Sequence, residues 1–148
     1  MAKIHRDLKE FVELLNSAKI DYLIVGAHAM AFYGVPRYTG DLDILVRASE
    51  DTAPKLVSVL NQFGFSPGQF SNADFLEPKR VTQIGVAPNR IDLLTTIDGV
   101  AFDDAWEAAV PGHLDGIPTK FISKRHLIDN KRAVGRSQDI ADIQRLEK

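Results

Sequence analysis

Residues 22–46 constrain the fold of this chain most, because they place two carboxylates on one strand shortly after a glycine turn. The segment reads YLIVGAHAMAFYGVPRYTGDLDILV. Its apolar start predicts a short buried strand that ends at Gly26, and residues 27–33 favour a helix that a Gly-x-Pro sequence then breaks. A second apolar strand carries Asp41 and Asp43. The stretch therefore predicts a strand, a glycine turn, a helix and an acidic strand.

The acidic strand points to a metal site. Asp41 and Asp43 are separated by one residue, so on a strand both side chains project to one face, about 6 to 7 Å apart along the backbone. Two adjacent carboxylates repel each other, and a cation bound between them removes that repulsion. Apolar residues alternate with the acids over 42–46, so the other face can enter the core. The alternative is that both acids cap a turn or pair with Arg37.

Composition places the chain among ordinary globular proteins. Its 148 residues, 45% hydrophobic and 26% charged, predict a single domain over residues 1–148. The absence of cysteine excludes disulfides, thiolate metal sites and thiol nucleophiles. A net charge of −2 argues against a surface built throughout to bind nucleic acid. With no secretory signal pattern and no apolar run near the roughly 20 residues that span a bilayer, we expect a cytoplasmic protein without a membrane segment.

Hydrophobic periodicity and turn residues predict the remaining elements. Helices are expected over residues 4–16, 49–63, 102–110, 123–133 and 137–146, and strands over 80–86, 90–96 and 117–122. The first two of these strands form a predicted hairpin, which would bring Asp92, a third carboxylate, to the sheet. Pro118 suits an edge strand, because proline donates no ladder hydrogen bond. Trp106 is expected in the core, and residues 65–78 in an irregular connection.

Together, a glycine turn entering a helix, an Asp-x-Asp strand and a third aspartate on a later strand resemble the nucleotidyltransferase superfamily of the DNA polymerase β type. The segments VGAHAMAFYGVPRYTGDLDILV, QIGVAPNRIDLLTTIDGV and LIDNKRAVGRSQDIADIQRL are similar to small bacterial nucleotidyltransferases of the minimal and abortive-infection toxin branches. The resemblance implies an α/β fold, with a short, mixed, twisted sheet that carries the aspartates on one face. Helices would flank the sheet, and a helical C-terminal segment would close a nucleotide cleft.

The same resemblance implies the activity. An NMP unit would pass from ATP or another NTP to an acceptor hydroxyl, with two Mg²⁺ ions held by Asp41 and Asp43. Asp92 would complete the metal site and help to remove the acceptor proton; alternatively, it is a surface charge that follows Arg90. Relatives modify aminoglycosides, hydroxyl side chains of partner proteins or tRNA ends. Toxin-antitoxin membership, with an antitoxin-like partner protein, is implied on the same ground.

Residues around the glycine turn are candidates for nucleotide binding. Gly26 lets the backbone approach a triphosphate, and the following helix offers N–H groups. Relatives commonly have Ser or Gly at the next position, so Ala27 gives up a hydroxyl contact and keeps the backbone contact. Arg37 could stabilise phosphate charge, and Thr39 could hold the turn or contact a phosphate oxygen. The alternatives are a tight turn without a ligand at Gly26, and Arg37 as a counter-ion of the acids.

The C-terminal region concentrates positive charge. Its cations are Lys120, Lys124, Arg125, Lys131, Arg132 and Arg136. The resemblance makes Lys131 and Arg136 candidates for binding nucleotide phosphates, whereas Asp139 and Asp142 are expected to be structural, with Ser137 as the cap of their helix. The basic stretch agrees with a tRNA acceptor, and a solvated helical surface explains it as well.

Two other classes of function compete with the transferase. One is a non-catalytic nucleotide-binding or partner-binding module with the same fold. The presence of all three aspartates argues against it, and Ala27 argues for it. The other is metal-dependent hydrolysis of phosphodiesters. His28, in the helix after the glycine turn, is expected to be an exposed or packed side chain rather than a metal ligand.

Overall fold

The computed structural model of the protein describes residues 5–36, 40–85 and 89–148. Its helices are α1 (Arg6–Ser17), α2 (Gly26–Phe32), α3 (Thr52–Phe63), α4 (Phe102–Glu107), α5 (Lys124–Val134) and α6 (Ser137–Leu146), with a 3-10 helix η1 (Asn72–Phe75). Its strands are β1 (Tyr22–Val25), β2 (Leu42–Val46), β3 (Val81–Ile84), β4 (Ile91–Leu94), β5 (Val110–Leu114) and β6 (Ile117–Phe121).

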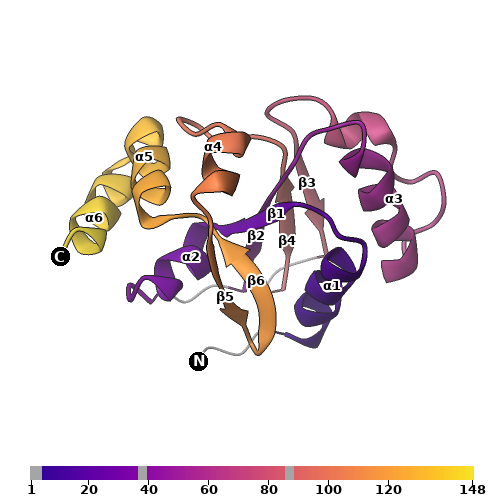
Figure 1. The fold of residues 1–148 in the computed structure, drawn as a ribbon, viewed down its shortest axis with the longest axis horizontal. Coiled ribbons are helices and arrows are strands. Elements are labelled where there is room, and N and C mark those ends of the chain that lie inside the picture. Colours follow the sequence, from indigo (N-terminus) through magenta and orange to yellow (C-terminus); the bar gives the residue numbers. More distant parts are fainter. Residues whose placement is uncertain (1–4, 37–39, 86–88) are drawn as a thin grey trace.

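The strands form one mixed sheet of six, in the order β3-β4-β2-β1-β6-β5 (Figure 1). β1 pairs antiparallel with β2 and parallel with β6, and β2 pairs parallel with β4. The antiparallel hairpins β3–β4 and β5–β6 form the two edges of the sheet. The predicted hairpin over 80–96 and the predicted short mixed sheet are both confirmed.

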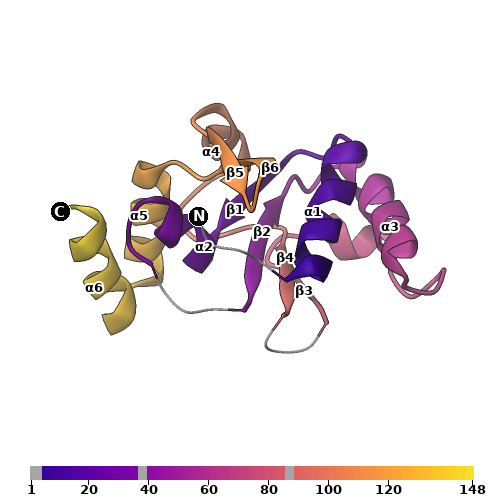
Figure 2. The same cartoon turned by 90° about the horizontal axis from the view of Figure 1, so that it is seen from below.

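Helices stand at both ends of the molecule (Figures 1 and 2). α1 and α3 pack together at one end, where the rings of Phe11 and Phe63 meet edge to face with centroids 5.2 Å apart. α5 and α6 pack together at the other end, as the predicted helical C-terminal segment. The longest of these helices have 12 residues, and in the described ranges no helix has the length and apolar character needed to cross a membrane.

The β5 edge of the sheet differs from the prediction. The helix expected over 102–110 ends at Glu107, and residues 110–114 form β5. β6 then lies between β1 and β5, so its predicted edge position is wrong, and β5 is the edge strand. Pro118 is tolerated inside the sheet because β6 pairs with β1 at Phe121, the far end of the strand.

Ser123, where the predicted helix begins, is the N-cap of α5, whereas the predicted cap Ser49 lies two residues before the N-cap of α3, Asp51. Ser49 and Ser123 accept hydrogen bonds from backbone amides in the first turns of α3 and α5, each at 3.1 Å. The cap of α6 is Arg136 and not Ser137, because the Arg136 backbone N–H donates to the Asp139 carboxylate at 3.2 Å. Asp139 therefore supports the helix start from inside its first turn.

Candidate functional site

Three aspartates meet at the middle of the sheet, where β2 and β4 run side by side. Asp43 in β2 lies directly opposite Asp92 in β4. Residues directly opposite each other on paired strands present their side chains to one face. The Arg90 guanidinium joins Asp41 to this pair, with Nη2 3.0 Å from Asp41 Oδ2 and Nε 2.9 Å from Asp92 Oδ1. The structure thus brings together the acids predicted from two separate stretches.

Negative charge crowds the carboxyl group of Asp43. Burial is the largest cause of a pKa raised to about 7, and the charge of Asp92, a hydrogen bond with Asp92 and the charge of Asp41 raise it further. The charge of Arg90 acts in the opposite direction. A cation bound beside Asp43 would lower this raised pKa and favour the ionised form of its carboxyl group.

Gly26 brings the turn after β1 against the acids. Its φ is +68°, and a Cβ placed on it would lie 2.1 Å from Asp43 Oδ2. The Cγ and Cβ atoms of Asp43 would lie 3.0 and 3.1 Å away, so rotation of the carboxyl group alone does not relieve the contact. Only glycine combines this backbone conformation with so close an approach. The predicted glycine turn therefore faces the predicted acidic strand.

We expect Gly26→Ala to be less stable than Gly34→Ala by about 1–3 kcal/mol, because the new methyl group overpacks the site. Gly34 is a matched control, since it also has a positive φ, of +86°, and a Cβ there would meet no atom within 4 Å. Both substitutions cost stability because alanine is disfavoured at a positive φ, and only Gly26→Ala adds the contact with Asp43. Urea unfolding of the two variants measures the difference. Equal stabilities would contradict the close approach of Gly26 to the acid.

The donor set suits a hard divalent cation. Carboxylate oxygens are the ligands that Mg²⁺ prefers, and crowded carboxylates gain most from a cation among them. Among the residues that the structure describes, no three Asp, Glu, His or Cys side chains are arranged to hold a metal ion as they stand. The Arg90 guanidinium lies between Asp41 and Asp92. The three aspartates fit a divalent metal by their chemistry, and a metal between Asp41 and Asp92 would have to displace this guanidinium.

His28 in α2 is a neighbour of the site that the sequence did not single out as functional. It is half-buried, and it forms a hydrogen bond with the backbone of Asp41. Burial lowers its pKa, and this hydrogen bond partly offsets the effect. A largely neutral imidazole therefore holds the backbone of one acid. Its position two residues after Gly26 is the sequence signal that could have indicated this role.

Of the other residues predicted to bind nucleotide near the glycine turn, the structure describes only Ala27. Arg37 and Thr39 lie outside the described residues. Ala27 is the half-buried second residue of α2, and its methyl group offers no hydrogen bond to a phosphate. Nucleotide binding by Gly26, Ala27, Arg37 and Thr39 stays a prediction.

The C-terminal cations predicted to bind phosphate are paired with acids of the chain. Lys131 is buried, and its Nζ lies 3.0 Å from Asp142 Oδ2 and 3.5 Å from Asp139 Oδ1. Arg136 donates from Nε to Asp139 Oδ2 at 2.7 Å. Asp139 and Asp142 are each only 1% exposed, in agreement with the structural role expected of them. These pairs tie α5 to α6.

Asp139 remains charged within this pairing. The hydrogen bond from the Arg136 side chain is the largest cause of a pKa lowered to about 2, against the opposing effect of burial. The Arg136 backbone N–H and the charges of Arg136 and Lys131 lower the pKa further. Phosphate binding by Lys131 or Arg136 stays a prediction, and it would have to compete with these carboxylates.

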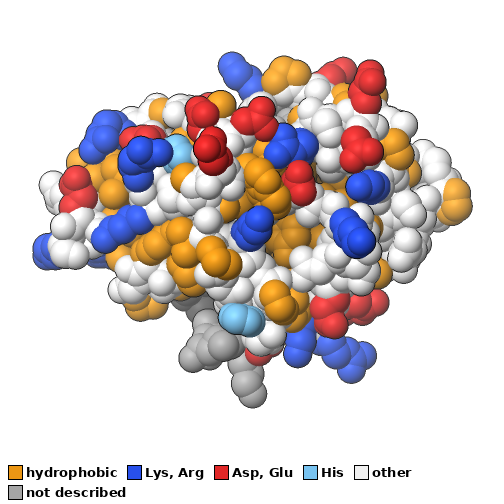
Figure 3. All heavy atoms as spheres, in the orientation of Figure 1, with side chains coloured by type: hydrophobic (Ala, Val, Ile, Leu, Met, Phe, Trp, Pro, Cys, Tyr) orange, Lys and Arg blue, Asp and Glu red, His pale blue; other side chains and the backbone are white. Residues whose placement is uncertain are grey.

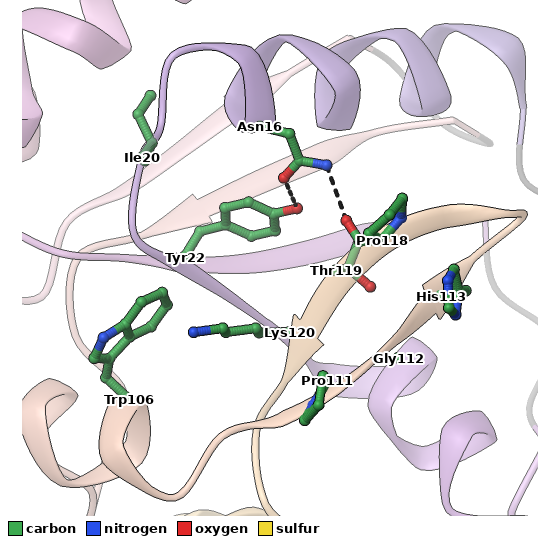
Figure 4. Close-up of a pocket in the computed structure, with 10 residues that line it drawn as sticks. All are labelled: Asn16, Ile20, Tyr22, Trp106, Pro111, Gly112, His113, Pro118, Thr119 and Lys120. Atoms are coloured by element: carbon green, nitrogen blue, oxygen red, sulfur yellow. Dashed lines mark hydrogen bonds between the residues drawn. The ribbon is translucent and has the colours of Figure 1, made fainter.

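A separate cleft of about 680 Å³ opens on the face drawn in Figure 3, where hydrophobic side chains gather around a hollow. Its lining comes from α1, α4, β1 and the β5–β6 hairpin, and comprises Asn16, Ile20, Tyr22, Trp106, Pro111, Gly112, His113, Pro118, Thr119 and Lys120 (Figure 4). Lys120 Nζ lies 4.0 Å from the centroid of the Trp106 ring. Trp106, predicted in the core, is half-buried: it packs against the core and also lines this cleft.

This cleft lies away from the acids along β1. Tyr22, which lines the cleft, pairs with Val46, whereas Val25 at the other end of β1 pairs with Asp43. Three residues of strand separate the two ends by about 10 Å. The cleft and the acidic cluster are therefore distinct features of the surface.

No protein-family model matches this chain, and no curated protein matches it by sequence. Solved structures do match. The lincosamide antibiotic adenylyltransferase LnuA, in its lincomycin-bound form, is similar over 99% of both chains, with 15% identity and a TM-score of 0.60. A Thermotoga maritima protein provisionally named a nucleotidyltransferase is similar over 95% of this chain and 89% of its own, with 15% identity and a TM-score of 0.61.

A third likeness is to the antibiotic-resistance factor ANT(2'')-Ia, over 95% of this chain and 80% of that protein, with 12% identity and a TM-score of 0.54. Together these likenesses show that the chain has the fold found in nucleotidyltransferases, a mixed sheet with flanking helices. The fold class predicted from the sequence is confirmed. At such low sequence identities the structural similarity is evidence for the fold alone.

Proposed function

We propose that this protein is a metal-dependent nucleotidyltransferase, which transfers an NMP unit from an NTP to the hydroxyl group of an acceptor. The observation that carries the proposal is the meeting of Asp43 in β2, Asp92 in β4 and Asp41 just before β2, beside the Gly26 turn. A fold shared with nucleotidyltransferases supports it.

Each acid has a role in this proposal. Asp41, Asp43 and Asp92 would hold two Mg²⁺ ions, as their oxygen donors and mutual repulsion favour. Bound Mg²⁺ would supply charge neutralisation for the attacking and leaving oxygens at the α-phosphorus. Asp92 would take up the proton of the acceptor hydroxyl as that oxygen attacks the α-phosphorus and pyrophosphate leaves. His28 holds the backbone of Asp41 in place.

The triphosphate is assigned first to the residues around the glycine turn. At Gly26 the absence of a side chain lets a phosphate approach the backbone. Arg37 and Thr39 follow in the chain and would contribute a guanidinium and a hydroxyl group. Lys131 and Arg136 already pair with Asp142 and Asp139, so they come second.

The acceptor is assigned to the class of hydroxyl-bearing small molecules. Two proteins of similar fold, the lincosamide adenylyltransferase LnuA and the resistance factor ANT(2'')-Ia, support this assignment. Hydroxyl side chains of proteins and tRNA ends remain competing acceptors. Toxin-antitoxin membership, an antitoxin-like partner and a cytoplasmic location stay predictions from the sequence.

A non-catalytic binding module is the second candidate, and one observation favours it. The Arg90 guanidinium already neutralises part of the acidic cluster, so the acids do not depend on a metal for all of their compensating charge. Such a module would bind an NTP or a partner protein and release no product.

Incubation with α-labelled NTPs, Mg²⁺ and a panel of acceptors tests the proposal. The panel contains hydroxyl-bearing antibiotics, tRNA and an extract of soluble proteins. We expect label on one acceptor class, an equal amount of pyrophosphate, and loss of both when EDTA replaces Mg²⁺. NTP binding without product would favour the module, and release of labelled NMP without a labelled acceptor would favour hydrolysis.

A further inference from the structure

A cation of the chain itself already bridges the acids of the candidate site. Arg90, which lies just before β4, donates from Nη2 to Asp41 Oδ2 at 3.0 Å. It also donates to Asp92 twice, from Nε to Oδ1 at 2.9 Å and from Nη2 to Oδ2 at 3.1 Å. The contact with Asp92 has the two-point geometry of the strongest guanidinium-carboxylate pairs.

We propose that Arg90 is a built-in counter-ion, which occupies the position between Asp41 and Asp92 in the metal-free protein and is displaced by a divalent cation. This inference rests on the proposed function, because the need for a cation at these aspartates comes from it. Arg90 then sets the metal affinity of the site and preserves its geometry between metal-binding events.

Charge explains why the two cations exclude each other. A guanidinium brings one positive charge to a group of three carboxylates, and a divalent ion brings two at a shorter distance. Both cations seek the same oxygens of Asp41 and Asp92, so binding of one weakens binding of the other.

Exposure makes the exchange physically simple. The Arg90 side chain is 31% exposed and that of Asp92 only 11%, so the arginine can move into solvent while the acid keeps its place. The contrary hypothesis is that Arg90 assists the metal by orienting Asp92. Its removal would then weaken metal binding.

Binding of Mn²⁺, followed by electron paramagnetic resonance, tests the proposal without any measurement of activity. We expect Arg90→Gln to bind Mn²⁺ about tenfold more tightly than the unmodified protein, because a competing charge is removed. In EDTA the same variant should unfold at a lower temperature, because its acids have lost their counter-ion. Mn²⁺ should therefore raise its melting temperature by more than that of the unmodified protein.

Arg80→Gln is the matched control. Arg80 also bridges two acids, Asp74 and Glu77, each at 2.6 Å, and it is 41% exposed. It lies outside the acidic cluster, so its replacement should leave Mn²⁺ affinity unchanged. Arg90→Lys keeps the charge and loses the two-point contact, so it should bind Mn²⁺ with intermediate affinity, and it serves if Arg90→Gln does not fold.

The outcomes separate this inference from the proposed function. Equal or weaker Mn²⁺ binding by the Arg90 variants would contradict the counter-ion role of Arg90, even if the unmodified protein transfers label. Tighter binding by these variants supports the counter-ion, even if no acceptor is ever labelled. An absence of Mn²⁺ binding in every variant overturns both.

Discussion

Asp43→Asn is expected to lose nucleotidyl transfer by at least about 10³-fold, because metal ions held by the acids supply several kcal/mol of transition-state stabilisation. Asparagine keeps the size of the side chain and removes its charge. Asp43 is the acid that faces Asp92 across the strands and touches the Gly26 turn, so its loss affects both metal and triphosphate. The initial rate of label transfer from an α-labelled NTP measures the effect.

The stability of this variant is expected to change in the opposite direction. The folded protein raises the pKa of Asp43 to about 7 through burial and neighbouring acids. An unfolded aspartate titrates near pH ~3.9, so ionised Asp43 costs stability as the pH rises from about 4 to about 7, and the full cost persists above that range. In EDTA at pH 8, Asp43→Asn should therefore be at least as stable as the unmodified protein in urea.

Asp51→Asn controls for the loss of an aspartate as such. Asp51 is 85% exposed and pairs with Lys55 one turn along α3 at 3.4 Å, so its replacement should change stability by less than about 1 kcal/mol and leave transfer intact. If Asp43→Asn transferred label at the rate of the unmodified protein, Asp43 would have no role in the reaction. If the variant unfolded, the charge of Asp43 would be needed to support the fold.

The sequence predicted the acidic cluster because each part of it obeys a local rule. Alternation along a strand places Asp41 and Asp43 on one face, and glycine marks the turn at residue 26. The contact of Asp43 with Asp92 depends on parallel pairing of β2 with β4, which joins residues about 50 positions apart. Local patterns do not determine such pairing, so this contact came from resemblance and needed the structure.

The sequence analysis overlooked one counter-ion of the acids, Arg90, and its assignment of Arg37 to that role stays a prediction. The sequence offered Arg37, which lies close to the acids along the chain but outside the described residues. Arg90 was treated only as the residue that makes Asp92 a surface charge. Its spacing of two from Asp92 places both side chains on one face of an extended chain, and that signal was present in the sequence.

Strand β5 was missed because its composition hides it. Pro111 and Gly112 are poor strand residues, so residues 110–114 did not look extended. Gly112 leaves room for the Phe32 ring, since a Cβ there would lie 2.6 Å from Phe32 Cε1. Asp115 and Gly116, with φ of +50° and +83°, form a two-residue turn between β5 and β6. An Asp-Gly turn between apolar residues is a strong hairpin signal and could have revealed the strand.

Lys131→Met is expected to lower the free energy of unfolding by about 3–5 kcal/mol, the usual cost of breaking a buried ion pair from one side. Lys131 Nζ lies 3.0 Å from Asp142 Oδ2, and the two side chains are 11% and 1% exposed. Methionine fills similar space but removes the ammonium group from a buried carboxylate. Urea unfolding followed by circular dichroism measures the loss, which should appear as a lower midpoint with an unchanged slope.

Two further variants separate the ion pair from general effects. Arg132→Met changes the adjacent cation, which is 59% exposed and 3.9 Å from Asp129, and it should cost less than about 1 kcal/mol. The double variant Lys131→Met with Asp142→Leu removes both charges, so it should recover much of the lost stability. Failure of the double variant to recover would mean that Lys131 stabilises the helix pair by packing.

The same variants decide whether Lys131 also binds nucleotide. A lysine with an ion-paired, structural role predicts that Lys131→Met loses stability, and that the double variant regains it with unchanged NTP affinity. If Lys131 also binds phosphate, the double variant is again stable, but it binds NTP more weakly than the unmodified protein. Because α5 follows β6 directly and β6 pairs with β1 beside the Gly26 turn, either result also shows whether the C-terminal helices take part in the nucleotide site.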